Sequence, residues 1–246
     1  MEIRILSLVV MLGLAAAGYA ADQAAVDHEL PLETFDEYQP ASFPEQWQAR
    51  GDEAVARAVY QVAEEGGDRF LHARAEKQDV QIGLSHVFQP KDFPLLRWRW
   101  RVEQLPSGGD ERATKTNDSA AAVYVIFDSR IVPRVIKYVW SSTLPVGTHF
   151  TSPVYWRAEV VVLQSGTSRL EEWLPETVNV YQDYKELFGA EPGEAQGIAV
   201  LTDADSTASV AEADYDDFVL LPAAAVPAEE AKGAVARLSP TPAAAQ

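Results

Sequence analysis

The strongest constraint on the fold is residues 95–102, Leu-Leu-Arg-Trp-Arg-Trp-Arg-Val, in which arginine alternates with large apolar side chains. Side chains two positions apart share one face of a β-strand, whereas an α-helix would spread both kinds around its circumference. The stretch therefore predicts a strand with an apolar core face and a charged face. The core face comprises Leu96, Trp98, Trp100 and Val102, and the charged face comprises Arg97, Arg99 and Arg101.

The composition favours one all-β domain and excludes several functions. The 246 residues are 47% apolar and 10% aromatic, with 14 Gly and 15 Pro to supply turns. A net charge of −17 argues against nucleic acid and against anionic membrane surfaces as partners. The chain has no cysteine, which excludes disulfides, thiol catalysis and cysteine-ligated metals. No motif in the sequence requires a cofactor.

Residues 1–20 have the pattern of an export signal. Arg4 precedes the apolar run 5–17, and Gly18-Tyr19-Ala20 offers small residues at the two positions that a signal peptidase reads. The run is shorter than a typical membrane span, and an uncleaved anchor is the alternative. We therefore expect a periplasmic or secreted protein that is not inserted in the membrane after cleavage.

The rest of the chain divides into a flexible leader (21–34), a folded domain (35–221) and a disordered Ala/Pro-rich tail (222–246). Within the domain, short strands recur at the spacing of a β-sandwich, and one short helix is expected near 181–188. The expected strands are 59–63, 69–75, 80–88, 95–102, 120–127, 135–141, 155–164, 173–180, 196–202 and 218–221. We predict a single all-β sandwich of the jelly-roll type, with an up-and-down barrel as the alternative.

Several sequence blocks, in order, carry a family resemblance. They are Arg97–Val102 with Leu105-Pro106, Tyr138–Ser142, Val161–Gly166, Val178–Tyr184, Phe188-Gly189 and Ile198–Thr207. Together they resemble the bacterial secreted family known as domain of unknown function 3047, over roughly residues 35–221. The resemblance implies an exported single-domain protein.

A looser resemblance concerns the closing Thr-Asp-x-Asp and Tyr-Asp-Asp-Phe patterns. They are similar to those of galactose-binding-like sandwiches, a fold that many carbohydrate-binding modules use. Ser206 stands where that pattern has Asn, and Asp216 stands where Gly is usual. A shared fold does not by itself determine function.

The arginine face is the first candidate site. Arg99 and Arg101, with Asp118 in the loop that follows, could form bidentate hydrogen bonds with carboxylates or vicinal hydroxyls of a glycan. The alternative is cross-strand ion pairing, with Glu159 directly facing these arginines.

Aromatic side chains form the second candidate set, because exposed rings can stack on the C–H faces of sugars. The set comprises Tyr124, Tyr138, Trp140, Tyr155, Trp156 and Trp173. Strand alternation assigns Trp98 and Trp100 to the core, so Trp140 and Trp156 are the better surface candidates. The alternative for each ring is burial in the core.

Acidic residues near the C-terminus form the third set, which comprises Asp203, Asp205, Asp214, Asp216 and Asp217. The Asp203-x-Asp205 spacing puts two carboxylates on one side of an extended chain, as oxygen-ligand sites for Ca²⁺ often need. The Gly and the late Glu of an EF-hand loop are missing. A structural calcium is one interpretation, and capping of backbone amides in a turn is the other.

These patterns favour an exported glycan-binding β-sandwich that acts in cell-envelope or extracellular polysaccharide handling. Its predicted ligand contacts are Arg99, Arg101, Asp118, Trp140, Asp203 and Asp205. One alternative is a glycoside hydrolase or polysaccharide lyase of the same fold, although the many carboxylates show no discriminating spacing. The other is a module that docks an envelope protein partner.

Overall fold

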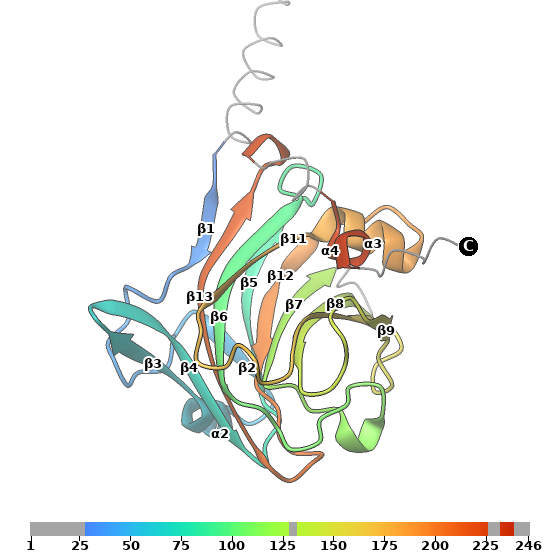
Figure 1. The fold of residues 1–246 in the computed structure, drawn as a ribbon. Coiled ribbons are helices and arrows are strands. Elements are labelled where there is room, and N and C mark those ends of the chain that lie inside the picture. Colours follow the sequence, from blue (N-terminus) through green and yellow to red (C-terminus); the bar gives the residue numbers. More distant parts are fainter. Residues whose placement is uncertain (1–27, 128–131, 226–231, 239–246) are drawn as a thin grey trace, which may run out of the picture.

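Two β-sheets packed face to face form the described part of the chain, which comprises residues 28–127, 132–225 and 232–238 of a computed structural model (Figure 1). The six-stranded sheet has the order β11-β6-β13-β4-β3, with β1 beside β13. The seven-stranded sheet has the order β2-β5-β12-β7-β8-β10-β9. All pairings are antiparallel except that of β8 with β10. The predicted all-β sandwich is confirmed, and the two separate sheets exclude the barrel.

The elements have the following bounds. The six-stranded sheet contains β1 (Leu30–Glu33), β3 (Tyr60–Glu65), β4 (Asp68–Glu76), β6 (Leu95–Gln104), β11 (Leu174–Asn179) and β13 (Val210–Leu221). The seven-stranded sheet contains β2 (Trp47–Arg50), β5 (Gln81–Phe88), β7 (Ala121–Phe127), β8 (Arg134–Ser141), β9 (His149–Thr151), β10 (Ala158–Ser165) and β12 (Ala195–Leu201). The helices are α2 (Glu53–Val59), α3 (Val180–Phe188) and α4 (Ala234–Leu238), with 3₁₀ turns at Thr114–Thr116 and Ala223–Ala225.

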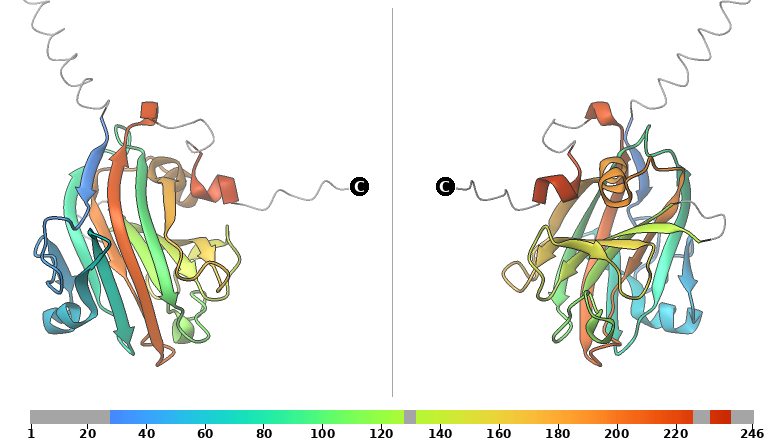
Figure 2. Two further views of the ribbon diagram at one scale, coloured as in Figure 1. Left: turned by 60° about the vertical axis from the view of Figure 1, so that its left-hand side comes forward. Right: turned by 90° about the vertical axis from the view of Figure 1, so that its right-hand side faces the viewer.

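The arginine-rich stretch forms β6, as predicted, between β11 and β13 in the six-stranded sheet (Figure 2). Its apolar face is buried against the other sheet. The ring of Trp98 lies 5.9 Å from that of Tyr138, and the ring of Trp100 lies 6.2 Å from that of Trp140. Aromatic pairs at such distances add to the stabilisation from burial, so these four rings join the two sheets at the centre of the core.

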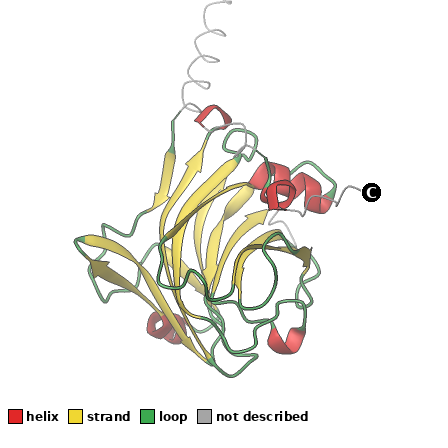
Figure 3. Cartoon of the chain, viewed as in Figure 1, coloured by secondary structure: helices red, strands yellow, loops and turns green. Residues whose placement is uncertain are grey.

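Local sequence explains two connections that position the sheets. The β3–β4 hairpin turns at Gly66 and Gly67, whose φ angles of 65° and 92° favour glycine, as in the two-residue turns that match strand twist. The predicted helix is α3, which begins after Asn179, whose side chain accepts a hydrogen bond from the Gln182 amide. It ends at Gly189, which has a φ of 63°. The helices are short and peripheral (Figure 3).

The predicted leader and tail are wrong for the parts that the structure describes. Residues 30–33 form β1, which pairs with residues 218–220 of β13, beyond the part of β13 that pairs with β4. In the tail, α4 packs against α3, with Ala234 and Val235 buried. Asp183 anchors it, since its carboxylate accepts hydrogen bonds from the Val235 amide and the Tyr138 hydroxyl.

The predicted signal peptide, residues 1–20, lies outside the described residues. Within the described ranges, none of the helices has the length and apolar character needed to cross a membrane.

Candidate functional site

A cavity of about 430 Å³ lies on the outer face of the seven-stranded sheet. Val125 and Tyr138 point into the core, so their neighbours Tyr124 and Lys137 must point away from it, towards the cavity. The turn that leads into β10 contributes further lining residues, among them Tyr155. Other polar lining side chains are Arg50, Asp79, Gln81, Asn117, Ser152 and Asp203.

Lys137 lies in the floor of this cavity and is only 4% exposed. It stands opposite Tyr124 in the register of β7 and β8, and its ammonium nitrogen is 5.7 Å from the centre of the Tyr124 ring. Burial tends to lower the pKa of Lys137, but interactions led by Tyr124 and Asp203 raise it above its ordinary value. The cavity floor therefore carries a protonated ammonium group.

Asp203 follows β12 and brings a carboxyl group into the same cavity, again with 4% exposure. Its backbone forms an isolated β-bridge with Asp79, so two cavity-lining acids lie on adjacent chain segments. Burial raises the pKa of Asp203 to about 8, against the opposing effect of the Lys137 charge. The charges of Asp118 and Asp205 add to the rise.

Three of the predicted ligand residues come together beside the cavity. Carboxylate oxygens of Asp118, Asp203 and Asp205 all lie within 4.8 Å of one another. Asp118 accepts hydrogen bonds from the backbone amides of Ser206 (3.1 Å) and Thr207 (2.7 Å), which is the turn chemistry foreseen for this acidic segment. The oxygen donors suit Ca²⁺ in type, although those of Asp118 are already hydrogen-bonded. A calcium ion here stays a prediction.

The other predicted contacts lie elsewhere, because the arginine face is on the outer side of the six-stranded sheet. Arg101 forms an ion pair with the fully buried Asp214 at 2.7 Å, and Arg99 forms one with Asp216 at 2.5 Å. The ring of Trp173 lies over both guanidinium groups, at 4.6 Å from Arg99 and 4.9 Å from Arg101. This is the ion-pairing alternative, formed within one sheet. A ligand role for Arg99 and Arg101 stays a prediction.

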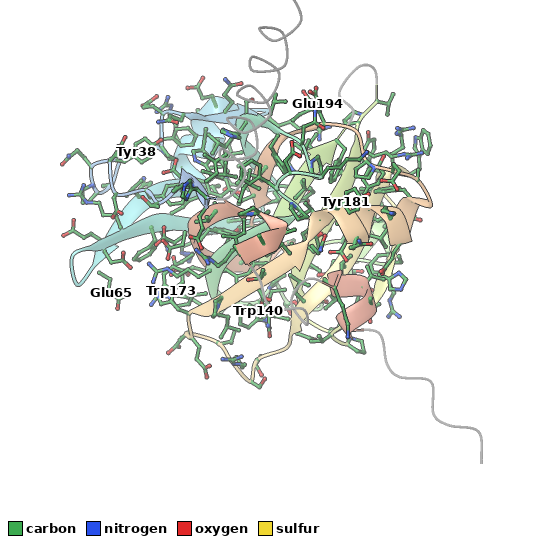
Figure 4. All side chains as sticks on the ribbon, turned by 90° about the horizontal axis from the view of Figure 1, so that it is seen from above. Tyr38, Glu65, Trp140, Trp173, Tyr181 and Glu194 are labelled. Carbon is green, nitrogen blue, oxygen red and sulfur yellow. The ribbon has the colours of Figure 1, made fainter. Side chains whose placement is uncertain are left out.

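The predicted partner of these arginines is wrong. Glu159 lies on β10 of the other sheet, where its carboxylate accepts a hydrogen bond from the Thr151 hydroxyl at 2.7 Å. Glu65, from the β3–β4 hairpin, instead pairs with Arg101 at 3.0 Å, on the same side of the molecule as Trp173 (Figure 4). Strand periodicity assigned the faces correctly but could not assign strands to sheets.

The prediction of Trp140 as a surface residue is also wrong. Its side chain is 1% exposed, and its indole N–H donates a hydrogen bond to the Gly166 carbonyl at 3.0 Å. It belongs to the core face of β8, and proximity to the end of the strand did not make it accessible. Trp156, the other surface candidate, is 70% exposed, so its predicted exposure is confirmed.

Lys137 is a site residue that the sequence patterns did not predict. One feature could have revealed it, since this lysine interrupts the otherwise apolar run Val135-Ile136-Lys137-Tyr138-Val139-Trp140. A charged side chain within a strand buried on both faces needs a specific environment. Asp79, Arg50 and Gln81 carry no comparable pattern, and only the fold brings them together.

The fold and the cavity define a two-sheet β-sandwich with a polar pocket on one sheet. The chain belongs to the family described as "Protein of unknown function (DUF3047)", whose model matches residues 45–219. No curated protein matches the sequence.

Three solved structures show a weak likeness to the chain. The Spr0440 glycoside hydrolase domain, Endo-D, from Streptococcus pneumoniae R6 shows 9% identity and a TM-score of 0.34, over 71% of this chain but only 21% of that one. The family 11 carbohydrate-binding module of cellulase Lic26A-Cel5E of Clostridium thermocellum shows 10% identity and a TM-score of 0.36, over 80% and 95% of the two chains. The family 11 xylanase from Neocallimastix patriciarum shows 11% identity and a TM-score of 0.35, over 78% of this chain and 99% of that one.

Proposed function

We propose that the protein binds a glycan or a similar polyhydroxylated ligand in the cavity of the seven-stranded sheet. One observation carries this proposal: Lys137 and Asp203 are both 4% exposed and face the same cavity. Within the described ranges, no carboxylate oxygen lies close enough to the Lys137 ammonium to form an ion pair. Lys137 interacts with Tyr124, and Asp203 accepts a long hydrogen bond of 3.5 Å from the Asp205 amide. An ammonium group has three donors and a carboxyl group has several acceptor positions, so each buried group retains hydrogen-bonding capacity that a ligand can use.

Neighbouring hydroxyl groups match this pair chemically. An ammonium group only donates hydrogen bonds, and an ionised carboxylate only accepts them. A hydroxyl does both, so two adjacent hydroxyls of a sugar ring can accept from Lys137 and donate to Asp203. When protonated, Asp203 can also donate to a ring or hydroxyl oxygen.

The rest of the cavity fits the same class of ligand. Its volume of about 430 Å³ falls within the range of about 300–1,000 Å³ that is usual for small-ligand pockets. Arg50, Gln81 and Asn117 add planar polar groups suited to hydroxyls, and Tyr124 and Tyr155 add aromatic surface. In this proposal the protein is exported by residues 1–20 and handles envelope or extracellular polysaccharide.

One further observation favours hydrolysis as a second candidate function. Glycoside hydrolysis commonly uses two carboxyl groups that flank the scissile bond. Asp79 and Asp203 both line the cavity, on segments joined by a β-bridge. Release of reducing sugar that Asp79→Asn abolishes, with binding retained, would establish this activity.

Thermal unfolding of the mature protein with a panel of oligosaccharides tests the binding proposal. A glycan at about 100 times its dissociation constant should stabilise the protein by about 2.7 kcal/mol, which raises Tm by several degrees. Lys137→Met should remove the response, whereas Lys115→Met, at an exposed lysine, should retain it. A wild-type protein that responds to no glycan contradicts the proposal and favours the docking of a protein partner.

A further inference from the structure

Trp156 is the exception among the tryptophans of this protein. Four of the six are buried, whereas the Trp156 side chain is 70% exposed. It is also the most exposed of the large apolar side chains in the described ranges. A single exposed apolar side chain is common on protein surfaces, so the position of Trp156 relative to the cavity decides its significance.

The turn that carries Trp156 forms one wall of the cavity. Tyr155 and Val154, immediately before it, line the cavity, and so does Ala158, two residues beyond. The Tyr155 hydroxyl donates a hydrogen bond to the Pro133 carbonyl at 2.6 Å, and the Ala158 amide donates to the Tyr155 carbonyl at 2.8 Å. Trp156 is thus held on a braced turn beside the proposed glycan site.

The orientation of the indole ring is also restrained. The guanidinium carbon of Arg157 lies 5.3 Å from the centre of the Trp156 ring, within the range of a cation–π contact. Because the side chain remains 70% exposed, this contact leaves most of the ring surface open. A restrained ring loses little conformational entropy when a ligand stacks on it.

We infer that Trp156 forms a second subsite, on which the C–H face of a neighbouring sugar ring stacks while another ring occupies the cavity. The inference rests on the proposed function and specifies its ligand class. The ligand is an oligosaccharide or polysaccharide of at least two rings that extends from the Lys137 cavity across the turn. Val154, which lines the cavity and is 55% exposed, adds apolar surface on the same turn.

Glycan-array binding of four proteins tests the inference: wild type, Trp156→Ala, Trp156→Phe and Lys137→Met. The array carries matched sets of monosaccharides and their oligosaccharides. We expect wild type to prefer the longer member of one set, and Trp156→Ala to lose that preference, with affinity for the oligosaccharide about tenfold weaker. Trp156→Phe should recover part of the loss, because it keeps an aromatic face.

The outcomes separate the two proposals. Unchanged oligosaccharide affinity in Trp156→Ala, with binding lost in Lys137→Met, overturns the second subsite and leaves the proposed function intact. No binding of any glycan by wild type overturns both. A change of molecular mass in solution as the sole effect of Trp156→Ala would assign this surface to self-association and overturn the inference.

Discussion

Lys137 of β8 lies directly opposite Tyr124 of β7, with its ammonium nitrogen 5.7 Å from the centre of the tyrosine ring, and both side chains face a cavity. The pair occupies the middle of the sheet, where Val139, Val160 and Val162 form a buried apolar cluster nearby. Such a position disfavours a lysine unless its charge is used. This relationship moves the proposed glycan site from the arginine face to the seven-stranded sheet.

Removal of Arg101 should destabilise the protein strongly. Arg101→Met leaves the fully buried Asp214 carboxylate without its guanidinium partner, and breaking a buried pair typically costs about 3–5 kcal/mol. Arg97→Met is the matched control, because within the described residues Arg97 pairs with the exposed Glu29 alone, and its loss should cost less than about 1 kcal/mol. Chemical denaturation measures the free energy of unfolding of both variants. Unchanged stability of Arg101→Met, together with lost glycan binding, would instead return the site to the arginine face.

Trp140 and Trp156, which the sequence analysis predicts for the surface, should respond oppositely to truncation. Trp140→Ala removes a buried ring that packs against Trp100 and should lower the free energy of unfolding by about 3–5 kcal/mol. Trp156→Ala removes an exposed ring and should change it by no more than about 0.5 kcal/mol. Urea denaturation compares the free energies of unfolding of the two variants. Equal destabilisation would contradict the assigned exposures.

A histidine on β4 should make stability depend on pH. The hydrogen bond between His72 Nδ1 and Asp214, at 2.8 Å, raises the pKa of His72 against the effect of burial, and Glu212 and Glu103 add to the rise. The folded state therefore binds the proton more tightly than the unfolded state. The resulting stabilisation is fully present below pH 6.5, the unfolded value, and is lost as pH rises through the folded pKa.

The difference in unfolding free energy between wild type and His72→Gln, measured from pH 5 to pH 9, tests this prediction. The stability that wild type has over His72→Gln should be larger near pH 5 than near pH 9. His149→Gln, at an exposed position on β9, provides the control. A pH-independent difference for His72→Gln would show that protonation of His72 does not contribute.

Calcium should act through the three carboxylates beside the cavity. Ca²⁺ is expected to raise Tm of wild type relative to EDTA, because Asp118, Asp203 and Asp205 supply oxygen ligands within 4.8 Å of one another. Asp205→Asn should remove this response with little other effect, since Asp205 is exposed. Identical unfolding in Ca²⁺ and EDTA would assign the cluster to turn capping alone.

Local patterns predicted the strands better than the site. The period-two alternation of β6 gave its faces correctly, because burial of Trp98 and Trp100 depends only on which side of the strand they occupy. Asp118 and Asp203 were chosen separately, and they meet because the loop before β7 crosses the segment after β12.

Trp140 and Lys137 show where local reasoning fails. The accessibility of each depends on which strands form the opposite sheet and which segment covers the outer face. Those relationships join residues far apart in sequence, such as Trp140 with Trp100 and Lys137 with Asp203. Periodicity within one strand carries no information about them.

The affinity of Lys137→Met for the glycan that most stabilises wild type tests the central claim most directly. Titration calorimetry should show binding at least tenfold weaker than that of wild type, about 1.4 kcal/mol, because the ligand loses its donor in the cavity. The variant should stay close to the wild-type free energy of unfolding, since methionine keeps the apolar stem of the buried lysine and removes the cost of burying its charge. Wild-type affinity in a folded Lys137→Met protein would contradict a glycan site in this cavity.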